Sequence, residues 1–221
     1  MKFESITMEN FMRYKGRNHI EFSCDDVKNV TVVLGDNTVG KTTIAQAFRW
    51  GLYGALMANG TKSAGDFQLL NTDILEMMDA NSRAKVKVEI AAVDEEKRYI
   101  ITRETTYTRA FPKLESREFQ KKCAMRITEL EDMESYVEVD SNEIETLINE
   151  LFPKNLSHYF LFDGERWNDV SVGGVRENIK ESVHILTGLS AYREAKNHLK
   201  DMGSNSVIKK FRSEIKGSGA V

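Results

Sequence analysis

The residues with the clearest chemical purpose are two glycines, a lysine and a threonine at fixed spacing. Gly35, four further residues, Gly40, Lys41 and Thr42 form the pattern G-x-x-x-x-G-K-T, which is the P-loop motif. The glycines allow the backbone to curl with its N–H groups aimed inward, as a cradle for phosphate oxygens. The ammonium group of Lys41 suits the outer phosphates of a nucleotide, and the hydroxyl of Thr42 suits Mg²⁺. The spacing therefore predicts a phosphate-binding loop.

This loop predicts ATP and Mg²⁺ as the cofactors. The helix expected after the loop directs its positive N-terminal end at the same phosphates. Thr42 is the protein ligand that we expect for Mg²⁺. The predicted nucleotide-binding residues of the loop are Asp36, Asn37, Thr38, Val39, Gly40, Lys41, Thr42 and Thr43.

The residues on either side of the loop fit the same interpretation. Residues 31–34 are apolar or β-branched, which predicts a short buried strand leading into the loop. After the loop, apolar residues and one glycine recur at the spacing of one helix face, namely Ile44, Ala47, Phe48, Gly51 and Leu52. Strand, loop and helix thus follow in the order that a P-loop requires. The alternative is a glycine-rich turn that matches the motif by chance.

A second stretch with candidate catalytic groups lies at residues 158–167. Residues 159–162 are apolar, so we expect a buried strand that delivers Asp163 and Glu165 at its carboxyl end, where α/β sheets bind ligands. Four apolar residues followed by an acid also fit a Walker B pattern. In that pattern Asp163 lies near Mg²⁺ and Glu165 polarises the attacking water. A purely structural carboxylate is the remaining interpretation of Asp163.

A basic loop is predicted between the first two strands, at residues 10–17. It carries Arg13, Lys15 and Arg17. The planar guanidinium of Arg13 is suited to stacking on an adenine ring or to pairing with a phosphate. The alternative for all three side chains is a solvated charge cluster.

Composition limits the class of protein. The chain has 221 residues, of which 41% are hydrophobic and 29% charged, typical of a soluble globular protein of one large domain or one and a half. The formal charge of −3 gives no overall nucleic-acid signature, so any DNA contact needs a local patch. Cys24 and Cys123 lack partners at metal-binding spacing and indicate reduced thiols. Neither a signal peptide nor an apolar span of membrane length occurs, so we expect a cytoplasmic protein without a membrane partner.

Alternation of apolar and polar residues predicts antiparallel strands. Residues 3–9 and 19–22 indicate two strands, and residues 84–107 and 123–139 each indicate a hairpin. Several basic side chains lie within or beyond these hairpins and either contact phosphate or belong to a solvated face. They are Arg103, Arg109, Lys113 and Arg117.

Helical periodicity appears in three further places. A short helix is expected over residues 72–79. Asp140 and Glu143 resemble a capping box that opens another helix, which Pro153 ends. From Ser190, the apolar spacing indicates either the start of a coiled coil or an isolated amphipathic helix.

The order of these motifs resembles the N-terminal half of the ATPase head of SMC-like, ABC-type ATPases. The resemblance covers roughly residues 1–202 and rests on Ile6-x-Met-Glu-Asn-Phe11, the P-loop, Ile44-x-x-Ala-Phe48 and Gly51-Leu-Tyr-Gly54. Three segments are most similar to the ATPase subunits of bacterial DNA phosphorothioation systems. They are Leu69-Leu-Asn-Thr-Asp73, Tyr159-Phe-Leu-Phe-Asp-Gly-Glu165 and Leu186-Thr-Gly-Leu-Ser190.

The resemblance implies an α/β fold. The expected P-loop head lobe has a mixed sheet with antiparallel β-hairpins, plus a helical lobe that leads into a coiled coil. Residues 1–188 would form the N-terminal half of the head, residues 189–216 the start of the coiled coil or a helical extension, and residues 217–221 a flexible tail. The C-terminal half of the head would complete the site, so we expect this chain alone to hydrolyse ATP weakly or not at all.

The resemblance also assigns roles to two side chains. It places residues 159–165 at the Q-loop, where Asp163 stands in the position of a glutamine and contacts Mg²⁺ or its water. It places the loop that carries Arg13 beside the bound nucleotide. Both roles are expectations from the family and not from the spacing of the residues.

The family implies an ATP-dependent head dimer that acts on DNA with other subunits of a modification, restriction or phage-defence system. One alternative is a nucleotide-gated assembly module of an SMC-like repair or defence complex, which recruits a nuclease and turns over slowly. A small-molecule kinase is a third possibility. The long hairpins between the P-loop helix and the next helix argue against the kinase.

Overall fold

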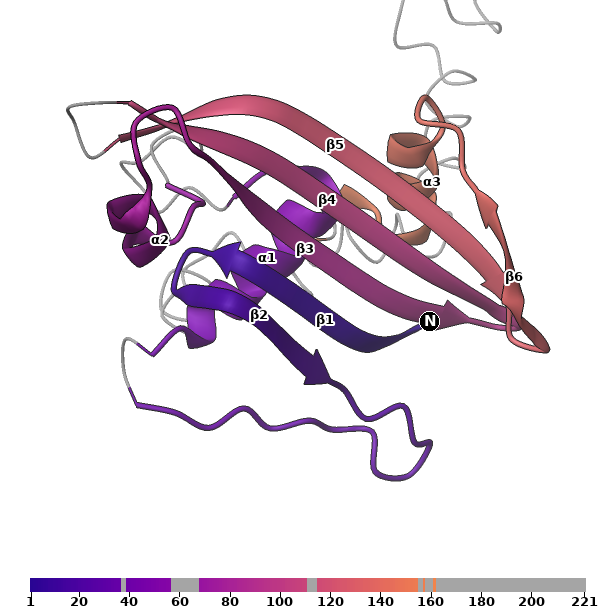
Figure 1. The fold of residues 1–221 in the computed structure, drawn as a ribbon. Coiled ribbons are helices and arrows are strands. Elements are labelled where there is room, and N and C mark those ends of the chain that lie inside the picture. Colours follow the sequence, from indigo (N-terminus) through magenta and orange to yellow (C-terminus); the bar gives the residue numbers. More distant parts are fainter. Residues whose placement is uncertain (37–38, 57–67, 111–114, 155–156, 158–160, 162–221) are drawn as a thin grey trace, which may run out of the picture. The chain divides into compact units, whose positions relative to one another are not determined.

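The computed structural model describes residues 1–36, 39–56, 68–110, 115–154, 157 and 161 (Figure 1). All of these residues belong to one compact unit, Met1–Asp163. The predicted boundaries after residues 188 and 216, and the helix expected from Ser190, lie outside the described residues. The strand expected over residues 159–162 is described only at Leu161, which is a bend.

The described part of the chain forms one six-stranded sheet and three helices (Figure 1). Every strand pair is antiparallel, and the strand order is β2-β1-β3-β4-β5-β6. The two predicted hairpins are confirmed as β3–β4 and β5–β6. The strands are β1 (Lys2–Phe11), β2 (Tyr14–Glu21), β3 (Arg83–Asp94), β4 (Lys97–Ala110), β5 (Glu115–Glu129) and β6 (Asp132–Glu138), and the helices are α1 (Lys41–Tyr53), α2 (Thr72–Met77) and α3 (Ile144–Leu151).

The two faces of the sheet differ because side chains alternate along each strand. In β3, Val86, Val88 and Ile90 are fully buried on one face. The residues between them, Lys85 and Lys87, lie on the other face and form ion pairs of 2.8 Å with carboxylates. The apolar face carries the core, and the opposite face is a lattice of paired charges.

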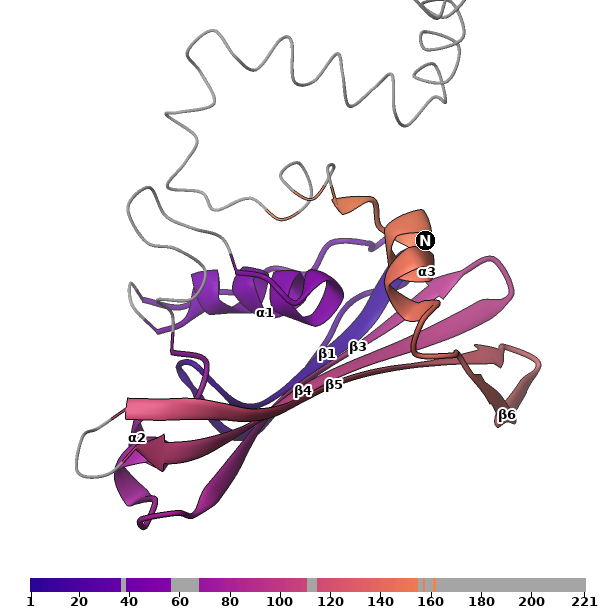
Figure 2. The same ribbon diagram turned by 90° about the horizontal axis from the view of Figure 1, so that it is seen from above.

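Helices α1 and α3 lie on the apolar face of the sheet (Figure 2). Helix α1 approaches β3 so closely that a Cβ on Gly51 would lie 2.7 Å from the Cδ1 atom of Ile90. Aromatic rings fill the space beside this contact: Phe3 lies 4.8 Å from Phe48 and 5.1 Å from Phe152, between ring centroids. The helix that follows the P-loop is therefore fixed against the centre of the sheet.

Arg103 has a structural position that neither sequence interpretation anticipated. Its guanidinium donates hydrogen bonds of 3.1 Å to the carbonyl oxygens of Gly51 and Leu52, near the end of α1. It also donates to Glu145 of α3 at 2.8 Å. Arginine at a helix C-terminus satisfies carbonyls that have no partner within the helix. Arg103 thus joins β4, α1 and α3 and is neither a phosphate ligand nor a solvated side chain.

Two local predictions near the strand and helix ends were wrong. The basic loop is shorter than expected, because β1 continues to Phe11 and β2 begins at Tyr14, which leaves a two-residue turn. The capping box before α3 does not form. Glu143 is the N-cap residue without a side-chain cap, and the Asp140 carboxylate instead accepts from the N–H of Asn142 at 2.8 Å.

The expected buried strand at residues 31–34 is absent. These residues form no strand, and the neighbouring apolar side chains are largely exposed, with 71% of Val32 and 88% of Leu34 accessible (Figure 1). Cross-strand pairs are what stabilise a strand, and no described strand pairs with this stretch. Apolar character alone was therefore insufficient to predict burial here.

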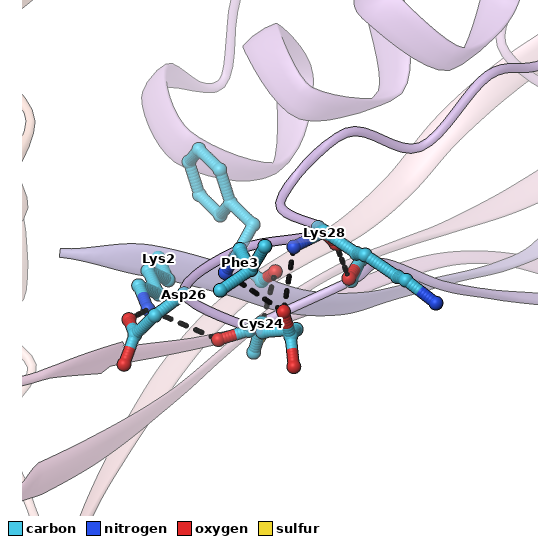
Figure 3. Close-up of polar contacts among 8 residues, drawn as sticks. Lys2, Phe3, Cys24, Asp26 and Lys28 are labelled. Carbon is cyan, nitrogen blue, oxygen red and sulfur yellow. Dashed lines mark hydrogen bonds and ion pairs between the residues drawn. The ribbon is translucent and has the colours of Figure 1, made fainter.

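The segment before this stretch is held against the start of β1 (Figure 3). The ammonium group of Lys2 pairs with Asp26 and donates to the carbonyl oxygen of Cys24 at 3.0 Å. The Cys24 thiol donates to the carbonyl oxygen of Phe3 at 3.4 Å. These contacts fix the direction in which the chain leaves β2 toward the P-loop.

No helix in the described part of the chain has both the length and the apolarity needed to span a membrane.

Candidate nucleotide-binding site

The P-loop glycine Gly40 opens α1 in a conformation that favours glycine. Its φ of 112° and ψ of 17° lie in the left-handed region, where a side chain would be strained. The first turn of α1 contains no acidic residue, so the positive end of the helix is not neutralised by its own side chains. The loop therefore presents a helix N-terminus that suits an anion.

The side chain of Lys41 folds back over the loop that precedes it. Its ammonium group donates to the carbonyl oxygen of Gly35 at 2.6 Å and to that of Asp36 at 2.5 Å. Gly35 cannot be larger, because a Cβ there would lie 2.7 Å from Cγ2 of Val39. Gly35 and Lys41 thus occupy opposite ends of one tight loop, as the motif requires. Asn37 and Thr38, which belong to the predicted set, lie outside the described residues.

The two threonines after Lys41 differ in exposure. Thr42 is exposed and Thr43 is 8% exposed, so the Thr42 hydroxyl is the accessible one. An exposed hydroxyl in the first turn of α1, next to a lysine, fits Mg²⁺ bound between that hydroxyl and the phosphate oxygens of a nucleotide. Among the described residues, no group of three or more His, Cys, Asp or Glu side chains is placed to hold a metal ion. Asp163 and Glu165, the other predicted ligand and catalytic residues, lie outside the described part.

The turn between β1 and β2 lies against the P-loop. The Tyr14 hydroxyl donates to the carbonyl oxygen of Gly40 at 3.3 Å. A Cβ on Gly40 would lie 3.5 Å from the Cβ of Arg13. Burial raises the pKa of Tyr14, so the phenol remains a neutral donor at physiological pH. The exposed Arg13 side chain therefore starts beside the loop, whereas Lys15 points to α2, where it pairs with Asp73 at 3.6 Å.

Asn71 supports this turn from its other side, a role that the sequence did not reveal. Its side-chain NH₂ donates to the carbonyl oxygen of Met12 at 2.7 Å, and its backbone N–H donates to Asn10 at 2.9 Å. Its side-chain oxygen also accepts from the N–H of Ile74 and caps α2. A sequence signal did exist: asparagine is a preferred N-cap residue. Its second contact depends on the tertiary fold and had no such signal.

Arg49 connects α1 to the residues that precede Asp163. It is 7% exposed and donates to the carbonyl oxygens of Ser157 and Leu161 at 3.2 and 3.0 Å. Ser157 is itself buried, and its carbonyl oxygen also accepts from the N–H of Leu161 at 2.9 Å. The helix that begins at the P-loop thus holds the last described residues of this unit in place.

Comparison with known proteins adds a family. The family described as AAA domain matches residues 5–216. A solved structure from work on "ATP-driven dimerization and DNA stimulated activation of SMC ATPases" is 14% identical, with a TM-score of 0.44, and the match covers 81% of this chain and 96% of that one. No curated protein matches the chain.

The family match covers nearly the whole chain, and its general class agrees with the P-loop geometry on α1. It confirms the predicted fold class, an α/β P-loop ATPase domain with antiparallel hairpins. The chain belongs to the AAA domain family.

Proposed function

We propose that this chain binds Mg-ATP as the N-terminal half of an SMC-like ATPase head. The observation that carries the proposal is the geometry around Gly40. A left-handed glycine opens α1, the Lys41 ammonium lies over the loop, and Arg13 starts beside it. In this arrangement Lys41 and the N–H groups of α1 would hold the phosphates, and Thr42 would ligate Mg²⁺. Bound Mg²⁺ would supply charge neutralisation at those phosphates.

The exposed apolar stretch before the P-loop supports a head completed by a further segment. Val30, Val32 and Leu34 are 75, 71 and 88% exposed, although their residue types favour a paired strand. Exposed apolar stretches of this kind mark interaction sites. We assign residues 30–34 to a strand that pairs with the C-terminal half of the same head. ATP would then join two completed heads into a dimer.

The proposed substrate context is DNA. The segments at residues 69–73 and 159–165 are similar to those of phosphorothioation ATPases, which supports a role in DNA modification, restriction or phage defence together with other subunits. Asp163, at the Q-loop, would contact Mg²⁺ or its water, with Glu165 nearby. The alternative is a nucleotide-gated assembly module that recruits a nuclease and turns over slowly.

ATP hydrolysis by the full-length protein, measured with and without DNA, separates these functions. A DNA-processing ATPase hydrolyses ATP faster when DNA is present, and Lys41→Ala abolishes both rates. An assembly module binds ATP with the same dependence on Lys41, but its slow turnover is unchanged by DNA. Transfer of phosphate to a small acceptor would contradict both and indicate a kinase.

A further inference from the structure

A cavity at the far end of the sheet is lined by three arginines and a phenylalanine. It has a volume of 410 Å³ and lies where β3, β4 and β5 approach α2 (Figure 1). Its lining includes Asn81, Arg83, Arg109, Arg117 and Phe119, and no acidic side chain. The volume falls in the range of small-molecule sites and would admit a nucleotide unit. This cavity is separate from the P-loop, whose residues do not line it.

The strand register places two of the arginines in one row. Arg83 of β3 and Arg117 of β5 both pair with Thr108 of β4, so their side chains lie on the same face, on either side of one threonine. A bulge shapes the next position: Thr106 pairs with Gln120 and Tyr107 with Glu118, which leaves Phe119 as the extra residue. Bulges redirect side chains in this way. The guanidinium carbon of Arg83 lies 3.8 Å from the centroid of the Phe119 ring.

The charges of this row differ from those of the rest of the same face. Lys85 and Lys87, the next residues along β3 on that face, are neutralised by Glu104 and Glu89 at 2.8 Å. No carboxylate of the described residues lies within ion-pair distance of Arg83 or Arg117, and both side chains are exposed. Arg109 adds a third positive charge, and its guanidinium is oriented by the carbonyl oxygen of Met78 at 2.6 Å. The chain has a net charge of −3, so this local excess of positive charge is distinct from its overall balance.

We propose that this cavity binds a segment of single-stranded nucleic acid. Arg83 and Arg117 contact its phosphates, and Phe119, 54% exposed and already stacked with Arg83, receives an unstacked base. Positive grooves with aromatic platforms bind single strands without sequence preference. A phosphorylated protein would use the arginines but has no need of the ring, and a duplex keeps its bases stacked. The inference rests on the proposed action on DNA and specifies the contact.

Fluorescence anisotropy of a labelled oligo(dT) strand on the full-length protein tests the proposal. Arg83→Ala combined with Arg117→Ala should weaken binding at least tenfold and reduce the dependence of log affinity on log salt by about 2, one for each lost phosphate contact. Phe119→Ala should weaken oligo(dT) binding and leave the salt dependence and duplex binding unchanged. The matched control is Lys85→Ala combined with Lys87→Ala, which removes two positive charges from the same face, and it should bind nearly as the wild type does.

Three results would contradict the proposal, and they are distinguishable. If the wild type binds oligo(dT) and the double arginine variant binds it equally well, the cavity is not the contact, and the proposed action on DNA stands. If Phe119→Ala weakens duplex and single-strand binding equally, the preference for a single strand is wrong. If the wild type binds neither form of DNA but still binds Mg-ATP, the proposed action on DNA itself fails. All substituted side chains are exposed, and thermal unfolding of each variant checks that the fold is retained.

Discussion

At the scale of single residues, the site depends on positions where the backbone allows few alternatives. Gly40 has a φ of 112°, and Gly35 has no room for a Cβ beside Val39. These constraints explain why the motif has glycine at both positions and why it could be predicted from the sequence alone. Arg13 is different, because its place beside Gly40 depends on the turn between β1 and β2. Its role followed only from the family resemblance.

Arg13→Ala should weaken ATP binding by roughly tenfold, about 1.4 kcal/mol, because a guanidinium next to the loop pairs with phosphate or stacks on adenine. Isothermal titration with Mg-ATP measures this change. Arg17→Ala is the matched control, since Arg17 is also exposed but pairs across β1 with Glu9, away from the loop. Equal affinity in wild type and Arg13→Ala would place Arg13 among the ordinary surface charges.

The two cysteines should react at very different rates with a thiol reagent. Cys24 is exposed, whereas burial raises the pKa of Cys123. The thiolate is the reactive form, so Cys123 requires a higher pH than an ordinary thiol, whose pKa is about 8.5. Mass spectrometry of peptides labelled over a pH series should show Cys24 modified first and Cys123 lagging at every pH. Similar rates at both cysteines would mean that β5 does not pack as described.

At the scale of elements, the site is held by contacts between segments that are distant in the sequence. Asn71 joins the cap of α2 to the turn that carries Arg13, and Arg49 joins α1 to residues 157–161. The hairpins β3–β4 and β5–β6 could be predicted because alternation is a local signal. The failed strand at residues 31–34 could not be corrected from sequence, because pairing depends on which partner strands are present.

Asn71→Ala should lower the free energy of unfolding by about 1–3 kcal/mol, because it removes a helix cap and leaves a buried carbonyl of Met12 without its donor. It should also weaken ATP binding, since the Arg13 turn loses its support. Asn71→Ser is the informative control, because serine can still cap α2 but is too short to reach Met12. Chemical denaturation and ATP titration of both variants measure the two effects. If Asn71→Ser keeps stability but loses ATP affinity, the support of the turn matters separately from the cap. ATP affinity unchanged in both variants would contradict this role.

At the scale of the whole molecule, the described unit contains a P-loop on a rigid helix and an apolar stretch without a partner strand. The core holds α1 against the centre of the sheet through Ile90 and the aromatic cluster around Phe48. The phosphate-binding loop is therefore well supported on one side. On its other side, residues 30–34 are exposed, which is why we assign the completion of the head to a further segment.

The most direct test of this account is the effect of Mg-ATP on the melting temperature of the wild type and of Lys41→Ala. Ligand at a hundredfold excess over its Kd stabilises a folded protein by about 2.7 kcal/mol, so the wild type should melt at a clearly higher temperature with Mg-ATP. Lys41→Ala should melt at the wild-type temperature without nucleotide, because its side chain is exposed, and should lose most of the shift. Lys28→Ala, which removes an exposed lysine away from the loop, should keep the full shift. An equal shift in Lys41→Ala and wild type, or no shift in either, would contradict the assignment of this loop as the nucleotide site.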